Sequence, residues 1–232
     1  MRKTHLVIML LCIAVIGLPV TVSGLGLDVE AKAGAGIALG TTNNPNATGS
    51  ARVAGGGGVG ADLYLLNLGP VDLGISVGAE YSYLSFHSVW TGFLTSPFNV
   101  DQAADSNYSY LNFPIALLGR IPLTQSISVV VRAGGFLGYF LSGTSTDTYT
   151  PDIGQNGAQT LNSNNTYQWE YGLHFTAGTD IALNDSLAIA PALQFDMGLT
   201  DTTKPIPAPN GTDYKDTFWS LTLMVGIKYK VL

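Results

Sequence analysis

The side chains of this sequence that could do chemistry are charged residues at every second position. In LDVEAKAGAGIALG, which starts at Leu27, Asp28, Glu30 and Lys32 alternate with apolar residues. Residues two apart point to the same face of an extended strand, so each run of charges shares one face. Ten residues on such faces form the candidate site: Asp28, Glu30, Lys32, Arg52, Asp62, Glu80, Arg132, Glu170, His174 and Asp196.

Histidine suggests a catalytic alternative. His87 is followed by Ser88, and His174 shares a face with Glu170. No Ser, His and Asp with the arrangement of a triad stand out, and no His, Cys and Asp cluster has the spacing of metal ligands. We therefore predict a protein that is not an enzyme and has no cofactor, with a lipid-modifying enzyme as the less favoured alternative.

A glycine-rich run raises a second alternative. The run GGGGVG at 55–60 matches the G-x-G-x-x-G pattern of dinucleotide-binding loops. That pattern binds a nucleotide only between a buried strand and a helix, and both flanks here are strand-like. We interpret the run as a strand with small residues on one face.

The elements that must position the charges are long strands. Period-two alternation recurs in eight segments, at about 25–40, 50–66, 71–85, 108–121, 126–141, 166–182, 187–200 and 217–232. Most are much longer than the usual globular strand of about 5–6 residues. A tilted strand that crosses a membrane needs about 9–11 residues, so each segment could cross and project beyond.

The connections between these segments alternate in length. Short turns at 67–70, 122–125 and 183–186 separate longer polar links at 41–49, 86–107, 142–165 and 201–216. This alternation is typical of an up-and-down barrel with short periplasmic turns and long external loops. We predict an all-β, eight-stranded antiparallel transmembrane barrel with both termini on the periplasmic side.

Two observations favour a membrane barrel over a soluble β-protein, which would alternate as well. Many glycines share the phase of the charges, as expected where a narrow interior must make room for long side chains. Aromatic residues lie on the apolar face near the strand ends, where two interfacial girdles are expected. The predicted girdle residues are Tyr81, Tyr83, Tyr139, Tyr167, Trp169, Tyr171, Trp219 and Tyr229.

The interior of an eight-stranded barrel is just wide enough for side chains to fill it. Buried charges are tolerated only when they are paired and hydrogen-bonded. We therefore favour a network of ion pairs that plugs the lumen over a polar pore that selects ions.

Composition fixes the compartment and excludes one class of partner. Residues 1–24 carry Arg2 and Lys3, then an apolar run and small residues, which predicts a cleaved signal peptide followed by one domain at 25–232. Only 11% of residues are charged and the net charge is −6, so no basic surface is expected to meet nucleic acid.

Two prolines interrupt the strand pattern. Pro114 and Pro191 fall inside predicted strands, where each removes one ladder hydrogen bond. We expect a local bulge at each proline.

Two local patterns carry a family resemblance. YLNFPI at 110–115 and GIKYKV at 226–231 resemble a common strand motif and the C-terminal assembly signal of small outer-membrane β-barrel proteins of diderm bacteria. That group includes OmpX, OmpW and the OmpA membrane domain. The resemblance implies location in the outer membrane, contact with its lipids and insertion by the barrel-assembly machinery. OmpW-like members are associated with small hydrophobic compounds.

The link at 86–107 is more apolar than the other long links. Trp90, Phe93 and Phe98 are its candidate contact residues for host surface molecules or hydrophobic solutes, and packing on the barrel rim is the alternative. We predict a narrow porin-like channel for small or hydrophobic solutes, with a non-conducting surface-interaction or membrane-integrity barrel as the alternative.

Overall fold

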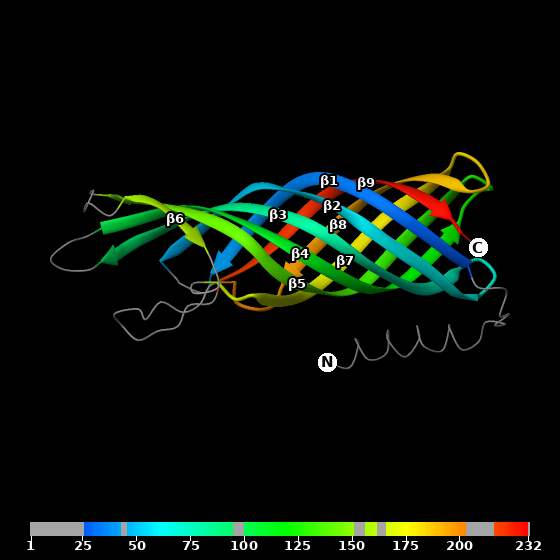
Figure 1. Ribbon diagram of the computed structural model, residues 1–232, viewed down its shortest axis with the longest axis horizontal. Coiled ribbons are helices and arrows are strands. Elements are labelled where there is room, and N and C mark those ends of the chain that lie inside the picture. Colours follow the sequence, from blue (N-terminus) through cyan, green and yellow to red (C-terminus); the bar gives the residue numbers. More distant parts are fainter. Residues whose placement is uncertain are drawn as a thin grey trace, which may run out of the picture.

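The computed structural model describes residues 26–42, 46–94, 100–150, 156–161, 166–202 and 216–231. The predicted signal peptide at 1–24 lies outside these residues. Strands account for nearly all of them (Figure 1). Their bounds are β1 Gly26–Thr42, β2 Ala47–Asn67, β3 Asp72–Leu94, β4 Val100–Pro122, β5 Ile127–Thr150, β6 Gly157–Leu161, β7 Trp169–Ala182, β8 Leu187–Gly198 and β9 Asp216–Lys230.

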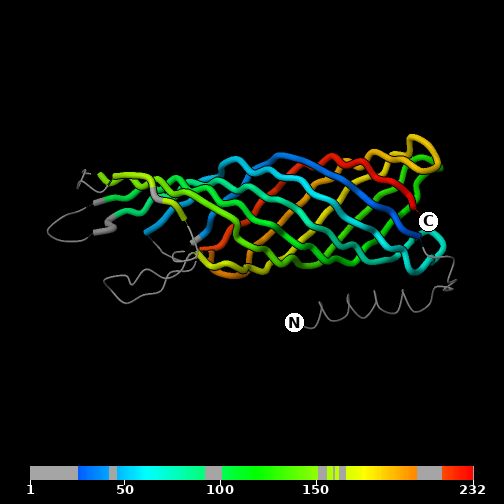
Figure 2. The backbone as a smooth tube through the Cα atoms, in the orientation of Figure 1, coloured from blue at the N-terminus to red at the C-terminus, as the bar shows by residue number. Residues whose placement is uncertain are grey.

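Eight of these strands form a closed antiparallel ring. The order is β4-β3-β2-β1-β9-β8-β7-β5, and pairing of β4 with β5 closes it. The short β6 pairs with the outer part of β5 and is not part of the ring. The strands wind around the barrel at a steep tilt (Figure 2). The predicted eight-stranded barrel is confirmed, and the structure adds β6, which the sequence pattern did not indicate.

The outside of the ring is apolar, and much of the inside is polar. Along β7 and β9 exposed and buried residues alternate strictly over most of the strand. Outward residues such as Leu117 and Ile227 are 74% and 63% exposed, whereas Glu80 and Lys228 on the inside are 5% and 3% exposed. No helix among the described residues is long and apolar enough to cross a membrane.

Side-chain hydrogen bonds fix the three short turns. Asn67 Oδ1 accepts from the backbone N–H of Gly69, whose φ of 83° suits a residue without a Cβ. Thr124 Oγ1 accepts from the N–H groups of Ser126 and Ile127. Asn184 holds its turn in the same way. All three turns lie at the end of the barrel that also holds the C-terminus (Figure 1).

The structure corrects two of the predicted loops. Most of 86–107 and 142–165 is strand, because β3, β4 and β5 contain 23, 23 and 24 residues. These segments are rich in Ser and Asn, which suggests loops, but they also alternate Thr with other residues, and threonine favours strands. They continue the β-sheet past the ring at the end opposite the short turns (Figure 1). We call this extension the projecting sheet: 47–51, 86–94, 100–109, 142–150 and 157–161.

The predicted bulges at the prolines are wrong. Opposite Pro114 the β3–β4 pairing stops after Val77 and resumes at Glu80 in unchanged register. Pro191 interrupts the β7–β8 ladder without a shift in the same way. Each proline lacks only its own N–H, so the ladder loses local bonds and the strand needs no extra residue. One of the register shifts lies instead between Ser109 and Tyr110, where β4 meets β5.

The apolar outer surface leads to a stability prediction. Leu117 lies midway along the barrel wall, whereas Leu123, 61% exposed, lies in a short turn. We expect Leu117→Arg to lower the free energy of unfolding in lipid vesicles by about 2–4 kcal/mol and Leu123→Arg by about 0–1 kcal/mol, because the cost of a charge depends on membrane depth. Equal costs in a denaturant titration would contradict a lipid-facing wall.

Candidate functional site

The candidate site is the lumen of the barrel, which is filled in successive layers. Nearest the short turns, both Arg120 Nε and Nη2 donate to Asp72 Oδ2 at 2.9 and 2.8 Å. Arg120 also lies 3.6 Å from Asp28 and stacks over the Tyr64 ring at 3.9 Å. This arginine therefore ties β1, β2 and β3 to β4 across the base of the lumen.

The second layer is centred on Asp62, which is 2% exposed. Arg132 donates to both of its carboxylate oxygens, at 3.1 and 2.6 Å, and Lys228 Nζ donates to Oδ2 at 3.0 Å. Arg132 also reaches Glu30 at 2.9 Å, and Lys228 reaches Asp180 at 2.8 Å. Two cations and three carboxylates from β1, β2, β5, β7 and β9 thus meet in one network.

The third layer runs across the middle of the lumen. Lys32 Nζ lies 2.7 Å from Glu80 and donates to Gln194 Oε1 at 2.9 Å. Gln194 Nε2 donates to Glu80 and to Asp196, whose other oxygen lies 2.6 Å from His174 Nδ1. Gln194, which sequence analysis did not single out, joins the two charged pairs. Its position in the charged phase of its strand is the signal that could have found it.

Space inside these layers is scarce. A cavity of about 20 Å³ lies beside Glu80, Gln194 and Asp196, with room for about one water molecule. A Cβ at Gly226 would lie 2.5 Å from Glu30 Oε1, and one at Gly58 would lie 2.9 Å from Glu80 Cγ. Glycine at these positions makes room for the ion pairs.

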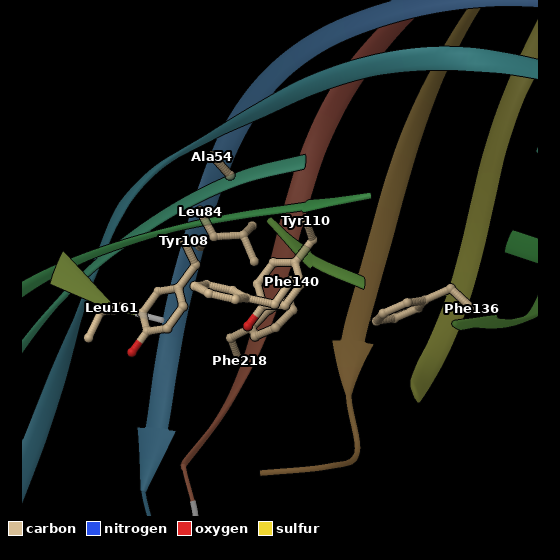
Figure 3. Close-up of a cluster of buried hydrophobic side chains, with 9 residues drawn as sticks. Ala54, Leu84, Tyr108, Tyr110, Phe136, Phe140, Leu161 and Phe218 are labelled. Atoms are coloured by element: carbon tan, nitrogen blue, oxygen red, sulfur yellow. The ribbon is translucent and has the colours of Figure 1, made fainter. Parts of the chain in front are cut away.

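An aromatic cluster covers the polar layers on the side of the projecting sheet. We call it the aromatic cap; its members are Ala38, Ala54, Leu84, Tyr108, Tyr110, Phe136, Phe140, Leu161 and Phe218. The rings of Tyr110, Phe140 and Phe218 gather inside the strands (Figure 3), with centroids 5.7 and 5.9 Å from Tyr110. Apolar rings therefore fill part of the lumen, in addition to the predicted ion pairs.

The aromatic cap also accounts for one of the apolar residues in the segment 86–107, which was predicted to be a loop. Phe86 of β3 packs against it and stacks on Tyr108 at 5.1 Å. Trp90 is half-buried in β3. Phe93 falls in β3 but its side chain is not among the described ones, and Phe98 lies outside the described residues.

Two predicted site residues lie apart from the ion-pair layers. Arg52 is half-exposed on the rim and contacts Asp105 at 3.3 Å instead of entering the lumen. Glu170 is in the lumen but forms no ion pair with a described residue.

Within the described lumen, acids outnumber Lys and Arg eight to four: Asp28, Glu30, Asp62, Asp72, Glu80, Glu170, Asp180 and Asp196 against Lys32, Arg120, Arg132 and Lys228.

The predicted girdle residues face outward. Six are at least 36% exposed, namely Tyr81, Tyr83, Tyr167, Trp169, Tyr171 and Tyr229. Tyr139 and Trp219 are half-exposed, and the Tyr139 ring packs edge-on against Trp169 at 4.8 Å.

Among the described residues, no group of three His, Cys, Asp or Glu side chains could hold a metal ion.

Comparison with protein families gives the chain's identity. The family described as outer membrane protein beta-barrel domain matches residues 23–204. The chain belongs to this family. Membership places the barrel in an outer membrane, with its apolar wall in contact with lipid. No curated protein matches the sequence.

Several solved outer-membrane barrels are similar to this one. Ail, the attachment invasion locus protein of Yersinia pestis, is 12% identical with a TM-score of 0.36, over 89% of this chain and 99% of Ail. Neisserial surface protein A is 11% identical with a TM-score of 0.39, over 90% and 100%. OprG from Pseudomonas aeruginosa is 12% identical with a TM-score of 0.46, over 89% and 96%.

The buried network leads to a second stability prediction. Arg132→Ala removes the partner of the buried Asp62 and the partly buried Glu30, so we expect the free energy of unfolding to fall by about 3–5 kcal/mol. Arg52→Ala breaks a pair whose side chains are 50% and 61% exposed and should cost less than about 1 kcal/mol. Denaturant titrations of the refolded variants measure both, and a small cost for Arg132→Ala would contradict a structural role for this layer.

Proposed function

We propose that this outer-membrane barrel is closed to solutes and displays the projecting sheet as an extracellular binding surface. The observation that carries the proposal is strand length. The 23 residues of β4 extend about 75 Å, whereas a membrane-spanning strand needs about 9–11 residues. Roughly half of β3, β4 and β5 thus forms ordered sheet beyond the membrane, and this part does not anchor the protein in the bilayer.

The exposed face of the projecting sheet supports recognition of a polar partner. Thr144, Thr146, Thr148 and Thr150 are exposed at alternate positions of β5. On the neighbouring β4, Thr146 pairs with Asp105. Regularly spaced hydroxyl and carboxylate groups on a paired sheet suit a polar surface such as a carbohydrate or a hydrophilic protein face.

Contacts between strands hold this face in shape. Asp105 is 2.8 Å from His87 Nδ1 on β3 and 3.3 Å from Arg52 on β2. Ser106 and Ser145 hydrogen-bond across β4 and β5 at 3.0 Å. A surface that is ordered before binding loses less conformational entropy when a partner binds.

The filled lumen supports the closed state. A solute would have to pass the aromatic cap and then break the Lys32–Glu80 and Arg132–Asp62 pairs. His174 is 3% exposed and its Nδ1 is engaged by Asp196, so the proposal includes no catalytic role. Contact with outer-membrane lipids and insertion by the barrel-assembly machinery remain part of it.

A narrow channel is the second candidate, and the excess of lumen acids favours it. If the layers rearranged, eight carboxylates against four Lys and Arg would attract cations and repel anions. This charge balance argues against the passage of hydrophobic solutes through the described lumen.

Planar-bilayer recording separates the two candidates. We expect the wild type and Phe140→Ala to show no steady openings, because the ion-pair layers remain when the aromatic cap is weakened. The double variant Phe140→Ala, Lys32→Ala should give brief, small, cation-selective openings. Leu137→Ala, on the lipid-facing side of the same strand, is the control. Large, steady openings of the wild type would overturn the proposed closed state.

Whole-cell binding tests the projecting sheet. Cells that display the wild type, Thr146→Lys with Thr148→Lys, or the control Leu123→Lys are applied to immobilised polysaccharides and hydrophilic matrix proteins. We expect the wild type and Leu123→Lys to adhere to the same surface. Adhesion of the double lysine variant to that surface should fall at least about tenfold, because two charged side chains disrupt a hot spot of the contact. Heat-modifiable migration on a gel shows that each barrel is folded. Equal adhesion of all three, or of none above barrel-free cells, would contradict the proposal.

A further inference from the structure

Beneath the aromatic cap lies a group of buried oxygens that the ion-pair layers do not use. Glu170 of β7 and Tyr110 of β4 are 2% and 1% exposed, and Asn112 of β4 is 6% exposed. Both Glu170 carboxylate oxygens, Tyr110 Oη and Asn112 Oδ1 lack a well-formed hydrogen bond to a described residue, although the Tyr110 hydroxyl lies close enough to Glu170 to interact with its carboxylate. Unsatisfied buried groups of this kind are rare in native proteins, and each one requires an explanation.

These oxygens converge from two strands on one part of the lumen. Glu170 pairs with Gly138 across β5 and β7, and Gly138 pairs with Asn112 across β4 and β5. A Cβ built on Gly138 would lie 2.7 Å from Asn112 Oδ1 and 3.1 Å from Glu170 Oε1, so both oxygens border the same space. Asn112 Nδ2 donates to Ser82 Oγ at 3.0 Å, which leaves Oδ1 directed toward Glu170. Tyr110 stands beside Asn112 in the same inward phase.

The charge around this group calls for a positive partner. Asp196, the charged group that acts on Glu170, is itself acidic and binds His174 and Gln194, and Lys32 of the third layer is engaged by Glu80 and Gln194. An ionised carboxylate in a low-dielectric interior is tolerated only when it is paired or coordinates a cation. The lumen as a whole also carries an excess of acids.

We propose that Glu170, Asn112 and Tyr110 form a binding site for a monovalent alkali cation, reached from the side of the projecting sheet. Carboxylate, amide and phenol oxygens are hard ligands suited to hard cations. One carboxylate with two neutral oxygens balances a single positive charge. Glu170 lies next to Trp169, where the β5–β7 ladder ends, so a cation arriving from that side would have to pass the aromatic cap but none of the ion-pair layers.

The stability of the refolded full-length protein in detergent tests the site. Unfolding midpoints are compared in sodium, potassium and N-methyl-D-glucamine chloride at one concentration; the last cation is too large to enter. A ligand that binds only the folded state raises the midpoint, here by about 3 °C or more for sodium or potassium over N-methyl-D-glucamine. Glu170→Gln should abolish this difference and should be at least as stable as the wild type in N-methyl-D-glucamine. Tyr110→Phe should shift the response to higher cation concentration.

Glu80→Gln is the matched control. It breaks the ion pair with Lys32 and should lower the midpoint in every salt while leaving the difference between salts unchanged. An equal midpoint of the wild type in all three salts would overturn the site, as would an undiminished salt response in Glu170→Gln. A midpoint that rises as pH falls, with no salt response, would show that Glu170 holds a proton instead.

Discussion

The constraint on which the rest of this structure depends is that the outer wall faces lipid. Lipid offers no hydrogen bonds, so every backbone N–H and C=O in the wall must find its partner in another strand. Pairing of β4 with β5 and of β1 with β9 removes the sheet edges and meets this requirement. The same constraint selects the outward residues: leucine, isoleucine, valine and phenylalanine along the wall, with tyrosine and tryptophan near its ends.

Closure with eight strands then determines what the interior can hold. A ring this small has no room for a wide aqueous passage, so the inward charges must neutralise one another at contact distance. Asp62 shows the result, with Arg132 and Lys228 both within 3.1 Å of its oxygens. Toward the projecting sheet, aromatic packing fills the lumen in place of ion pairs, as the ring contact between Tyr110 and Phe140 shows. The buried oxygens of Glu170 lie at the boundary between these two kinds of packing.

Much of this architecture was predictable because a barrel wall has a strict period of two. The alternation around Asp28, Glu30 and Lys32 was sufficient to assign the phase of β1, and the short turns were sufficient to orient the strands. Pairing partners were not predictable, because they depend on the register between strands distant in sequence, as for Arg132 and Asp62. The projecting sheet was missed because Ser, Asn and Thr suit loops and exposed strands alike. The aromatic cap was missed because Phe136 and Phe140 occupy the phase of the charges, and the large apolar residues of the other phase dominated the pattern.

The register shift between Ser109 and Tyr110 has a consequence for how this protein can vary. Along β5 the even positions Arg132, Phe136 and Phe140 are buried in the barrel, whereas beyond the shift the even positions Thr144 to Thr150 are exposed. One displaced residue therefore exchanges the environments of the two faces of a continuous strand. Substitutions beyond this point change the exposed face of the projecting sheet without entering the lumen. Gain or loss of a single residue there would turn the other set of side chains outward, so the shift separates the lumen-filling part of β5 from its exposed part.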